Sequence, residues 1–144
     1  MPGIVPHAVD IEPAAVACAR RNLGAGRVYE GDLDTPLPAS LQGRVAVVVA
    51  NAPYVPTNAI ALMPPEARDH EPRVALDGGA DGLDVQRRVA AAAPRWLAPG
   101  GSLLIETSEQ QASLTAEAAT AAGFVVRVER SEELDATAVV GTLP

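Results

Sequence analysis

Short apolar runs alternate with alanine-rich stretches along the chain. Residues 9–11 and 27–30 have the composition of short strands, and Val45–Ala50 is aliphatic at every position. A continuous aliphatic run of this length is typical of a parallel strand buried on both faces. Pro13–Leu23 has the composition of a helix, with Pro13 suited to its first turn and Gly24 to its end. This order predicts an α/β fold with helices on the faces of a sheet.

The second half of the chain continues the alternation. Residues 83–97 and 109–122 are predicted helices, ended by Pro99-Gly100-Gly101 and by Gly123, and residues 102–106 form a predicted strand between them. Residues 125–130 and 138–142 are predicted strands that pair as an antiparallel hairpin at the sheet edge. Residues 53–81 contain several prolines, glycines and charges, so we expect a binding loop without regular structure.

The length of 144 residues fits one globular unit with its own core. The longest aliphatic run is far shorter than the roughly 20 residues that a membrane span needs, so no membrane partner is expected. The first residues lack the pattern of a secretory signal, and Cys18 is the only cysteine, which excludes an internal disulfide. We therefore expect a cytoplasmic protein.

The net charge of the chain argues against one class of partner, the nucleic acids. The formal net charge is −7, and all 11 basic residues are arginines scattered among acids. Proteins that bind nucleic acids usually present a basic face whose phosphate contacts supply much of the affinity. A nucleic acid partner is therefore not expected.

Two acids follow predicted strands and are candidate ligands of a nucleotide-like cofactor. Asp10 stands between a strand and a helix, where a carboxylate can accept hydrogen bonds from ribose hydroxyls. Asp32 and Leu33 follow the next strand and could contact the amino group and the face of an adenine. The structural alternatives are an acid favoured by the helix dipole at Asp10 and an ordinary turn at residues 31–33.

The tetrapeptide Asn51-Ala52-Pro53-Tyr54 follows the aliphatic strand and suits the methylation of a planar nitrogen. The lone pair of such a nitrogen is delocalised, so acceptors must take its N–H hydrogens and aim it at the methyl group. Asn51 offers a side-chain carbonyl and Ala52 a backbone carbonyl, while Pro53 stiffens the turn and Tyr54 offers a flat face for stacking. The structural alternative is an Asn-x-Pro turn with a packing tyrosine.

Other notable residues are expected to be structural. His70 has only His7 as a companion histidine, so no metal site is expected. We expect an ion pair between Arg73 and Asp77 to tie down the loop. Cys18 and Trp96 are expected to pack against neighbouring elements rather than react.

Two strings in the loop complete a longer motif. Residues 65–73 read Pro-Glu-Ala-Arg-Asp-His-Glu-Pro-Arg, and residues 75–83 read Ala-Leu-Asp-Gly-Gly-Ala-Asp-Gly-Leu. With the tetrapeptide they resemble the release-factor glutamine methyltransferases, which carry Asn-Pro-Pro-Tyr, a Glu-Pro segment and Ala-Leu-x-Gly-Gly-x-Asp-Gly. The resemblance implies a Rossmann-like class I sheet, S-adenosylmethionine as cofactor, and transfer of a methyl group to the glutamine amide in the Gly-Gly-Gln motif of peptide-chain release factors.

The resemblance also assigns roles to single residues. Asn51 and Tyr54 are the expected catalytic residues, and residues 51–54 are expected to bind substrate. The residues expected to bind the cofactor are Asp10, Ile11, Asp32, Leu33 and Asn51.

The chain departs from the family pattern in two places. Ala52 replaces the first proline of the motif, although the backbone carbonyl needed there is kept. The first strand with its Gly-rich turn, and the N-terminal substrate-recognition domain before it, are absent from residues 1–144. We therefore expect a partial catalytic domain with unpaired edges at the strands that end at Asp10 and Asn51, open to self-association. A start codon assigned too far downstream, a fragment, and a half-domain completed by another chain would each explain this.

Two alternative functions remain open from the sequence. An adenine or guanine methyltransferase uses the same kind of tetrapeptide on a base flipped out of the duplex. The other alternative is a non-catalytic half-domain that acts as an interaction module.

Overall fold

The computed structural model describes residues 3–144, apart from the side chain of Ala25. The chain divides into two compact units, Met1–Leu41 and Gln42–Pro144. Each unit has its own sheet, and within the described residues no strand ladder joins the two sheets. The division follows the predicted gap in strand pairing between the strands that end at Asp10 and at Asn51.

The first unit contains a two-stranded parallel sheet and one helix. β1 (Ala8–Asp10) pairs with β2 (Val28–Glu30), with Ala8 opposite Val28 and Asp10 opposite Glu30. α1 (Pro13–Leu23) connects the two strands and buries Val16. The predicted bounds of this helix are confirmed, because Pro13 occupies its first turn and Gly24, at φ 83°, ends it.

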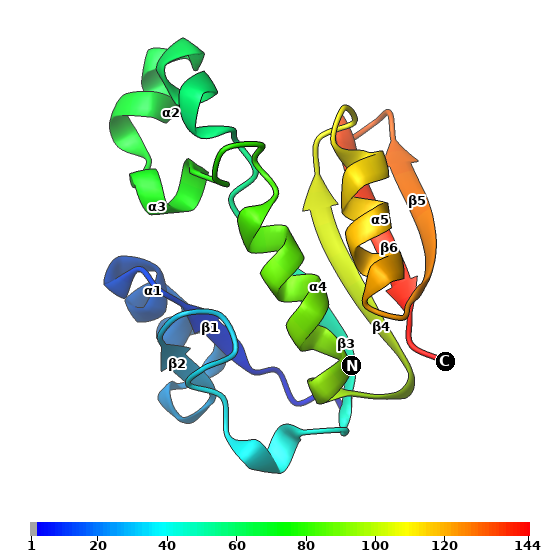
Figure 1. Cartoon of the computed structure of the whole chain (residues 1–144). Coiled ribbons are helices and arrows are strands. Elements are labelled where there is room, and N and C mark those ends of the chain that lie inside the picture. Colours follow the sequence, from blue (N-terminus) through cyan, green and yellow to red (C-terminus); the bar gives the residue numbers. More distant parts are fainter. Residues whose placement is uncertain (1–2) are drawn as a thin grey trace. The chain divides into compact units, whose positions relative to one another are not determined.

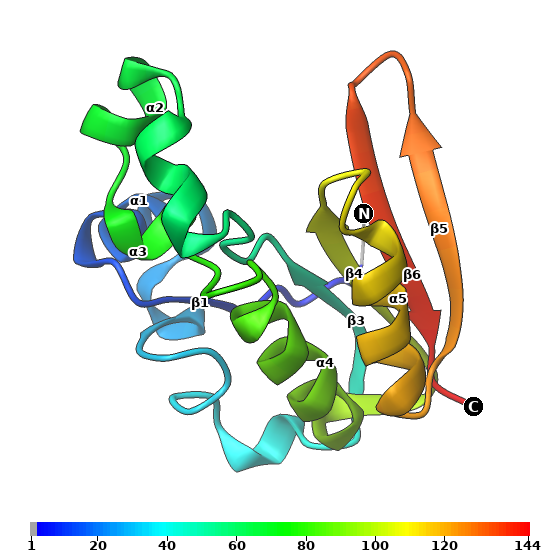
Figure 2. The same ribbon diagram turned by 45° about the horizontal axis from the view of Figure 1, so that its top comes forward.

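The second unit contains a four-stranded sheet in the order β3-β4-β6-β5 (Figure 1). β3 (Val45–Ala50) runs parallel to β4 (Leu97–Thr107). β6 (Ala136–Thr142) is antiparallel both to β4 and to β5 (Val125–Ser131). The hairpin formed by β5 and β6 is clear in Figure 2 and confirms the predicted antiparallel edge of the sheet.

Two helices, α4 (Asp84–Trp96) and α5 (Ala112–Ala121), lie on one face of this sheet (Figure 1). Thr107 of β4 contacts Thr115 of α5 through their hydroxyls, 3.1 Å apart, so Thr107 points to the helix face. Side chains alternate along a strand, so Leu103 and Ile105 point the same way, and both are fully buried. The core of this unit therefore lies between β4 and the two helices.

A buried polar network crosses the same interface. The Gln86 side chain on α4 donates to the Glu106 carbonyl on β4, at 3.2 Å, and accepts from the Thr115 hydroxyl, at 2.6 Å. Gln86 and Thr115 have no solvent exposure. Because buried polar groups are stable only when they are paired, this network fixes the positions of α4 and α5 over the carboxyl end of β4.

The prediction that Val45–Ala50 is buried on both faces is wrong in this structure. Val47 is 53% exposed and Val49 is 73% exposed. Val48 and Ala50 lie opposite Leu103 and Ile105 in the register, so they share the helix face, whereas Val47 and Val49 point to the other face. β3 is also the edge strand of its sheet, and among residues 3–144 β4 is the one strand that pairs with it. A uniformly aliphatic run cannot show which of its faces is covered.

The predicted irregular loop contains regular structure. Residues 53–81 include a 3-10 helix (Thr57–Leu62), α2 (Pro65–His70) and α3 (Arg73–Leu76). Each has a proline as its N-cap residue, Pro56, Pro64 or Pro72, where the missing N–H costs no hydrogen bond within the helix, and α2 also has Pro65 in its first turn, where its fixed φ suits a helix. The expectation of no regular structure is therefore wrong, because three of the prolines on which it rested stand at the starts of helices.

Two predicted boundaries also differ. Residues 99–101 lie inside β4, which begins at Leu97 immediately after α4. The pairing of β3 with β4 shifts register between Val45 and Val47, and this irregularity accommodates the two glycines. α5 begins at Ala112 rather than at residue 109, because residues 109–111 form a turn. In the described part of the chain, no helix is both long and apolar enough to cross a membrane.

Candidate functional site

The four cofactor candidates outside the tetrapeptide lie together in the first unit. Asp10 and Ile11 stand at the carboxyl end of β1, and Asp32 and Leu33 follow the carboxyl end of β2. Gly31 donates its backbone N–H to the Asp10 carbonyl at 3.0 Å, which joins the two strand ends. This is the edge of a parallel sheet at which α/β folds bind ligands.

The Asp10 side chain is exposed, and one of its oxygens accepts the backbone N–H of Glu12 at 2.9 Å. This contact lies at the entry to α1 and agrees with the structural alternative from the sequence, an acid placed near the N-terminus of a helix. It occupies Oδ1 only, and a carboxylate has acceptor sites on both oxygens. The geometry therefore accommodates both a helix-entry role and ribose binding at Asp10.

Leu33 has an unusual backbone conformation. Its φ is 49°, in the left-handed region that residues with a side chain rarely adopt. Strained backbone is concentrated at ligand-binding sites, where the surrounding structure imposes it. Ile11, across the two strand ends, is a large apolar residue exposed to solvent. The roles of Ile11 and Leu33 as contacts of a flat ligand stay a prediction.

The tetrapeptide lies in the second unit, directly after β3. Asn51 is exposed, Ala52 is buried, and Pro53 and Tyr54 are partly buried. Among residues 3–144, none forms a hydrogen bond with the side-chain amide of Asn51. The Asn51 carbonyl oxygen is therefore open to a substrate N–H at the carboxyl end of a sheet strand.

Backbone hydrogen bonds join the tetrapeptide to the glycine-rich string. The Val55 N–H donates to the Leu76 carbonyl at 3.0 Å, and the Val55 carbonyl accepts from Gly78 at 2.8 Å. Thr57 donates its N–H to the Gly79 carbonyl at 2.9 Å. The two parts of the motif, distant in sequence, are thus neighbours in the fold. Residues 57–76 form an excursion from the sheet, and these three hydrogen bonds close its base.

Asp77 organises this base. Its Oδ1 accepts the Thr57 hydroxyl at 2.6 Å and the Gly79 N–H at 3.0 Å. Its Oδ2 accepts from Arg73 at 3.4 Å, which confirms the predicted ion pair. The Thr57 hydroxyl is the main cause that lowers the pKa of Asp77, followed by the Gly79 amide, with Arg73 contributing less.

Acidification should loosen this loop through Asp77. Because the pKa of Asp77 is lowered in the folded state, its stabilising effect is complete above the ordinary value of about 3.9 and is lost as the pH falls through the lowered pKa. We expect pepsin to cleave within residues 57–76 increasingly fast, relative to Asp77→Asn, as the pH falls below about 4. The asparagine variant is the control, since its amide oxygen still accepts from Thr57 and Gly79 but does not titrate. A ratio of cleavage rates that does not change with pH would contradict the role of Asp77.

Asp81 joins the glycine-rich string to α4, a role that the sequence did not reveal. Its Oδ1 accepts the Leu83 N–H at 3.0 Å and an Arg87 guanidinium hydrogen at 3.0 Å. Arg87 is the main cause that lowers the pKa of the Asp81 carboxyl. The acid and the arginine were each visible in the sequence, but their pairing depends on the turn between them.

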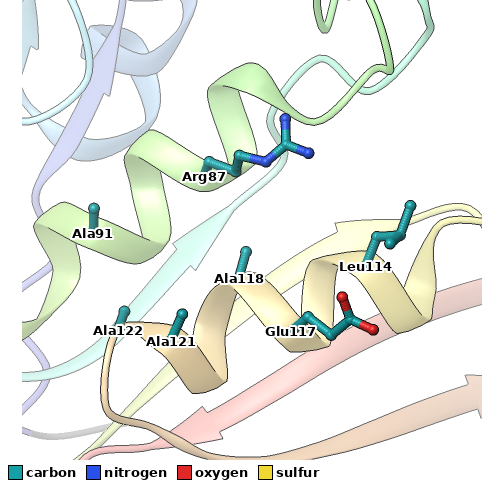
Figure 3. Close-up of a pocket in the computed structure, with 7 residues that line it drawn as sticks. All are labelled: Arg87, Ala91, Leu114, Glu117, Ala118, Ala121 and Ala122. Atoms are coloured by element: carbon teal, nitrogen blue, oxygen red, sulfur yellow. The ribbon is translucent and has the colours of Figure 1, made fainter.

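The second unit contains a groove between two helices and a separate cavity near the tetrapeptide. A groove of about 540 Å³ runs between α4 and α5 and contains none of the predicted site residues (Figure 3). Its lining residues are Arg87, Ala91, Leu114, Glu117, Ala118, Ala121 and Ala122. A cavity of about 440 Å³ lies in the excursion that follows Tyr54, with Ile60 and Leu76 buried at its wall and Arg68 and Arg73 also lining it. Across residues 3–144, His, Cys, Asp and Glu side chains form no cluster suited to a metal ion.

The structure brings each set of predicted residues together, but the two sets lie in different units. The cofactor candidates Asp10, Ile11, Asp32 and Leu33 belong to the first unit, and residues 51–54 belong to the second. Each set lies at the carboxyl end of its own sheet. The set in the first unit has the side chains that a nucleoside needs, and the set in the second unit has those that a planar amide needs.

Comparison with known proteins gives consistent results. The chain is 41% identical over 128 residues to the release factor glutamine methyltransferase of Geobacter sulfurreducens, an alignment that covers 83% of the chain and 44% of that protein. It is 40% identical over 125 residues to the ribosomal protein uL3 glutamine methyltransferase of Burkholderia pseudomallei, covering 80% and 40%. The chain thus spans less than half the length of these relatives. No protein-family model matches it.

Structural comparison supports the fold. The crystal structure of a methyltransferase from Pyrococcus furiosus superposes with a TM-score of 0.65 at 14% sequence identity, and the match covers 94% of this chain and 61% of the other. This agrees with the predicted Rossmann-like class I sheet.

Proposed function

Because the chain belongs to the protein-glutamine methyltransferase family, we propose that it carries the substrate-binding residues, and the residues that contact the nucleoside of the cofactor, of an enzyme that methylates the side-chain amide of a glutamine in a protein. The observation that carries the proposal is Asn51, whose side-chain amide is exposed at the carboxyl end of β3. Its oxygen is available to a substrate, and the turn around it is closed by the family's glycine-rich string.

The reaction needs orientation more than acid–base chemistry. A primary amide nitrogen carries two hydrogens, and the Asn51 side chain and the Ala52 backbone offer one carbonyl acceptor each. Accepting both hydrogens fixes the plane of the amide, and the ring of Tyr54 provides a surface against which that plane can stack. As the nitrogen forms its bond to the methyl carbon, the bond from that carbon to the sulfonium breaks and leaves a neutral thioether. The hydrogens on the nitrogen become more acidic and one is lost to water as a proton, so the two acceptors stabilise the transition state more than the bound substrate.

The first unit would hold the cofactor. Its residues fit the nucleoside part of S-adenosylmethionine, because Asp10 can accept from ribose hydroxyls while Ile11 and Leu33 can contact the base, with Asp32 beside its amino group. When bound, this cofactor supplies a methyl group on a positively charged sulfur.

The expected substrate is a peptide-chain release factor, methylated at the glutamine of its Gly-Gly-Gln motif. The names of relatives support a protein of the translation apparatus, since one acts on a release factor and another on ribosomal protein uL3. Such a substrate would place the reaction in the cytoplasm.

The arginine side chains favour a protein substrate over a nucleic acid base. Five arginines of the second unit lie in ion pairs with carboxylates, and a guanidinium paired in this way adds little net positive charge to a surface that would have to bind phosphates. These pairs are Arg68–Asp69, Arg73–Asp77, Arg87–Asp81, Arg127–Glu129 and Arg130–Glu109.

The proposed function can be tested by following a labelled methyl group. The chain is tested alone and fused, from Ala8 onward, behind the N-terminal part of the Geobacter relative, each with methyl-labelled S-adenosylmethionine, a release factor and duplex DNA. We expect the fused enzyme to label the release factor and leave the DNA unlabelled. Label in the DNA would favour the base methyltransferase, and label in neither would favour a non-catalytic interaction module.

We also propose that the chain associates with itself through the open edge of β3. Strand edges offer unpaired backbone groups to another strand, and the exposed Val47 and Val49 beside this edge add apolar surface. Val49→Lys should weaken association in sedimentation equilibrium by about tenfold or more, because burying one valine is worth about 1.5 kcal/mol.

The control for this measurement is Val125→Lys. Val125 is 69% exposed, close to the 73% of Val49, and lies on β5, the opposite edge strand of the same sheet. We expect it to leave the association constant unchanged. Equal weakening by both variants, or a monomer at every concentration, would contradict association through β3.

A further inference from the structure

The side chain of Gln111 contacts two segments of the predicted substrate site at once. Its amide nitrogen donates to the Tyr54 carbonyl at 2.9 Å and to the Asp81 carbonyl at 3.1 Å. A glutamine amide has two hydrogens, so both of its donors are used. One side chain thus holds the end of the tetrapeptide and the end of the glycine-rich string.

The Gln111 side chain is itself held in place. The Ser108 hydroxyl donates to the Gln111 side-chain oxygen at 2.8 Å and accepts from the Gln111 backbone N–H at 3.2 Å. These residues form the turn that leads from β4 into α5. β4 is the strand that pairs with β3, so the amide is anchored to the same sheet that delivers Asn51.

Close packing at Gly82 shows that the three segments meet tightly. A Cβ atom at this position would stand 2.3 Å from the Tyr54 carbonyl oxygen and 2.4 Å from the Gln111 amide nitrogen. Gly82 also has a φ of 80°, which favours glycine. The backbone of the glycine-rich string therefore lies directly against the hydrogen bond between Gln111 and Tyr54.

We infer that Gln111 is a positioning residue for methyl transfer, and this inference rests on the proposed function of residues 51–54. Pro53 has a fixed φ, and the Tyr54 carbonyl is held by Gln111, so the turn after β3 keeps few free dihedral angles. The Asn51 and Ala52 carbonyls are then presented in one direction. Glutamine is required because glutamate has the same shape but no hydrogen to donate to either carbonyl.

The first test is spectroscopic and uses the full chain. Tyr54-Val55 is the only Tyr-Val pair in the sequence, so tyrosine labelled with ¹³C at its carbonyl and valine labelled with ¹⁵N give one NMR correlation for this peptide bond. Gln111→Met keeps the length of the side chain without its donors, and Gln111→Glu keeps its shape. We expect both variants to move the Tyr54 carbonyl resonance upfield and to alter the Asn51 side-chain amide signals.

Gln110→Met and Gln110→Glu are the matched controls, because Gln110 is the exposed neighbour in the same turn. They should leave both sets of signals in place. An unchanged Tyr54 carbonyl resonance in the two Gln111 variants would overturn the inference.

The second test is kinetic and uses the fused enzyme described above. Gln111→Met should lower kcat by about 10- to 100-fold, the scale expected for a misplaced reacting group, with no change in KM for S-adenosylmethionine. A change in that KM instead of kcat, or an equal loss in Gln110→Met, would overturn the positioning role. If the unsubstituted enzyme transfers no methyl group, the proposed function fails and the positioning role fails with it, whereas the NMR result still decides whether Gln111 holds Tyr54.

Discussion

Replacing Asn51 with alanine is expected to lower the rate of methyl transfer to a protein glutamine by about 10²- to 10³-fold, the usual loss when one oriented hydrogen-bonding group is removed from a transition state. The side chain is exposed and follows β3 directly, so its removal should not disturb the core. The measurement is single-turnover methylation of a release factor by the fused enzyme.

The control for this prediction is Asn58→Ala. Asn58 is also an exposed asparagine, and it lies in the excursion only a few residues after the tetrapeptide. We expect it to retain nearly the full rate. A similar loss in both variants would show that the region is merely sensitive to substitution, and full activity in Asn51→Ala would remove Asn51 from the mechanism.

Gly82→Ala is expected to destabilise the second unit strongly. A non-glycine residue at its φ of 80° costs about 1–2 kcal/mol. The added Cβ would also stand 2.3 Å from the Tyr54 carbonyl oxygen, a backbone atom that cannot simply rotate away, and such overpacking costs about 1–3 kcal/mol more. Urea unfolding followed by the fluorescence of Trp96, the only tryptophan and a buried one, reports the free energy of unfolding.

Gly43→Ala separates the two causes. Gly43 has a φ of 66°, but a Cβ there would meet nothing within 4 Å. It should therefore lose only the backbone contribution, and the difference between the two variants measures the close packing of Gly82 against Tyr54 and Gln111. If the two variants lose equal stability, the close packing at Gly82 is not as the structure has it.

The sequence predicted elements well where local signals were strong. α1 has the bounds expected from Pro13 and Gly24, and the hairpin of β5 and β6 was visible as two apolar runs with a polar link. Prediction from the sequence failed where packing between distant elements determines the conformation. The exposed face of β3 depends on where α4 and α5 lie, and the helices after Pro56, Pro64 and Pro72 depend on the closed base that supports them.

Prediction of the site residues from the sequence had the same limits. The placement of Asn51 and Asp10 at the ends of parallel strands followed from their position after apolar runs. Gln111 was missed because it fell in the first turn of the helix predicted over residues 109–122, where a glutamine usually faces solvent, whereas it precedes α5 and turns toward Tyr54. Glutamine side chains that bond to distant backbone carbonyls leave no periodic signal in a sequence.

The central claim is that residues 51–54 orient a glutamine amide for methylation. Its most direct test is fragment mass spectrometry of a release factor after incubation with the fused enzyme and S-adenosylmethionine. We predict one added methyl group, located on the side-chain amide of the glutamine in the Gly-Gly-Gln motif and absent when Asn51 is replaced with alanine. A methyl group on any other residue, or on this glutamine regardless of Asn51, would contradict the claim.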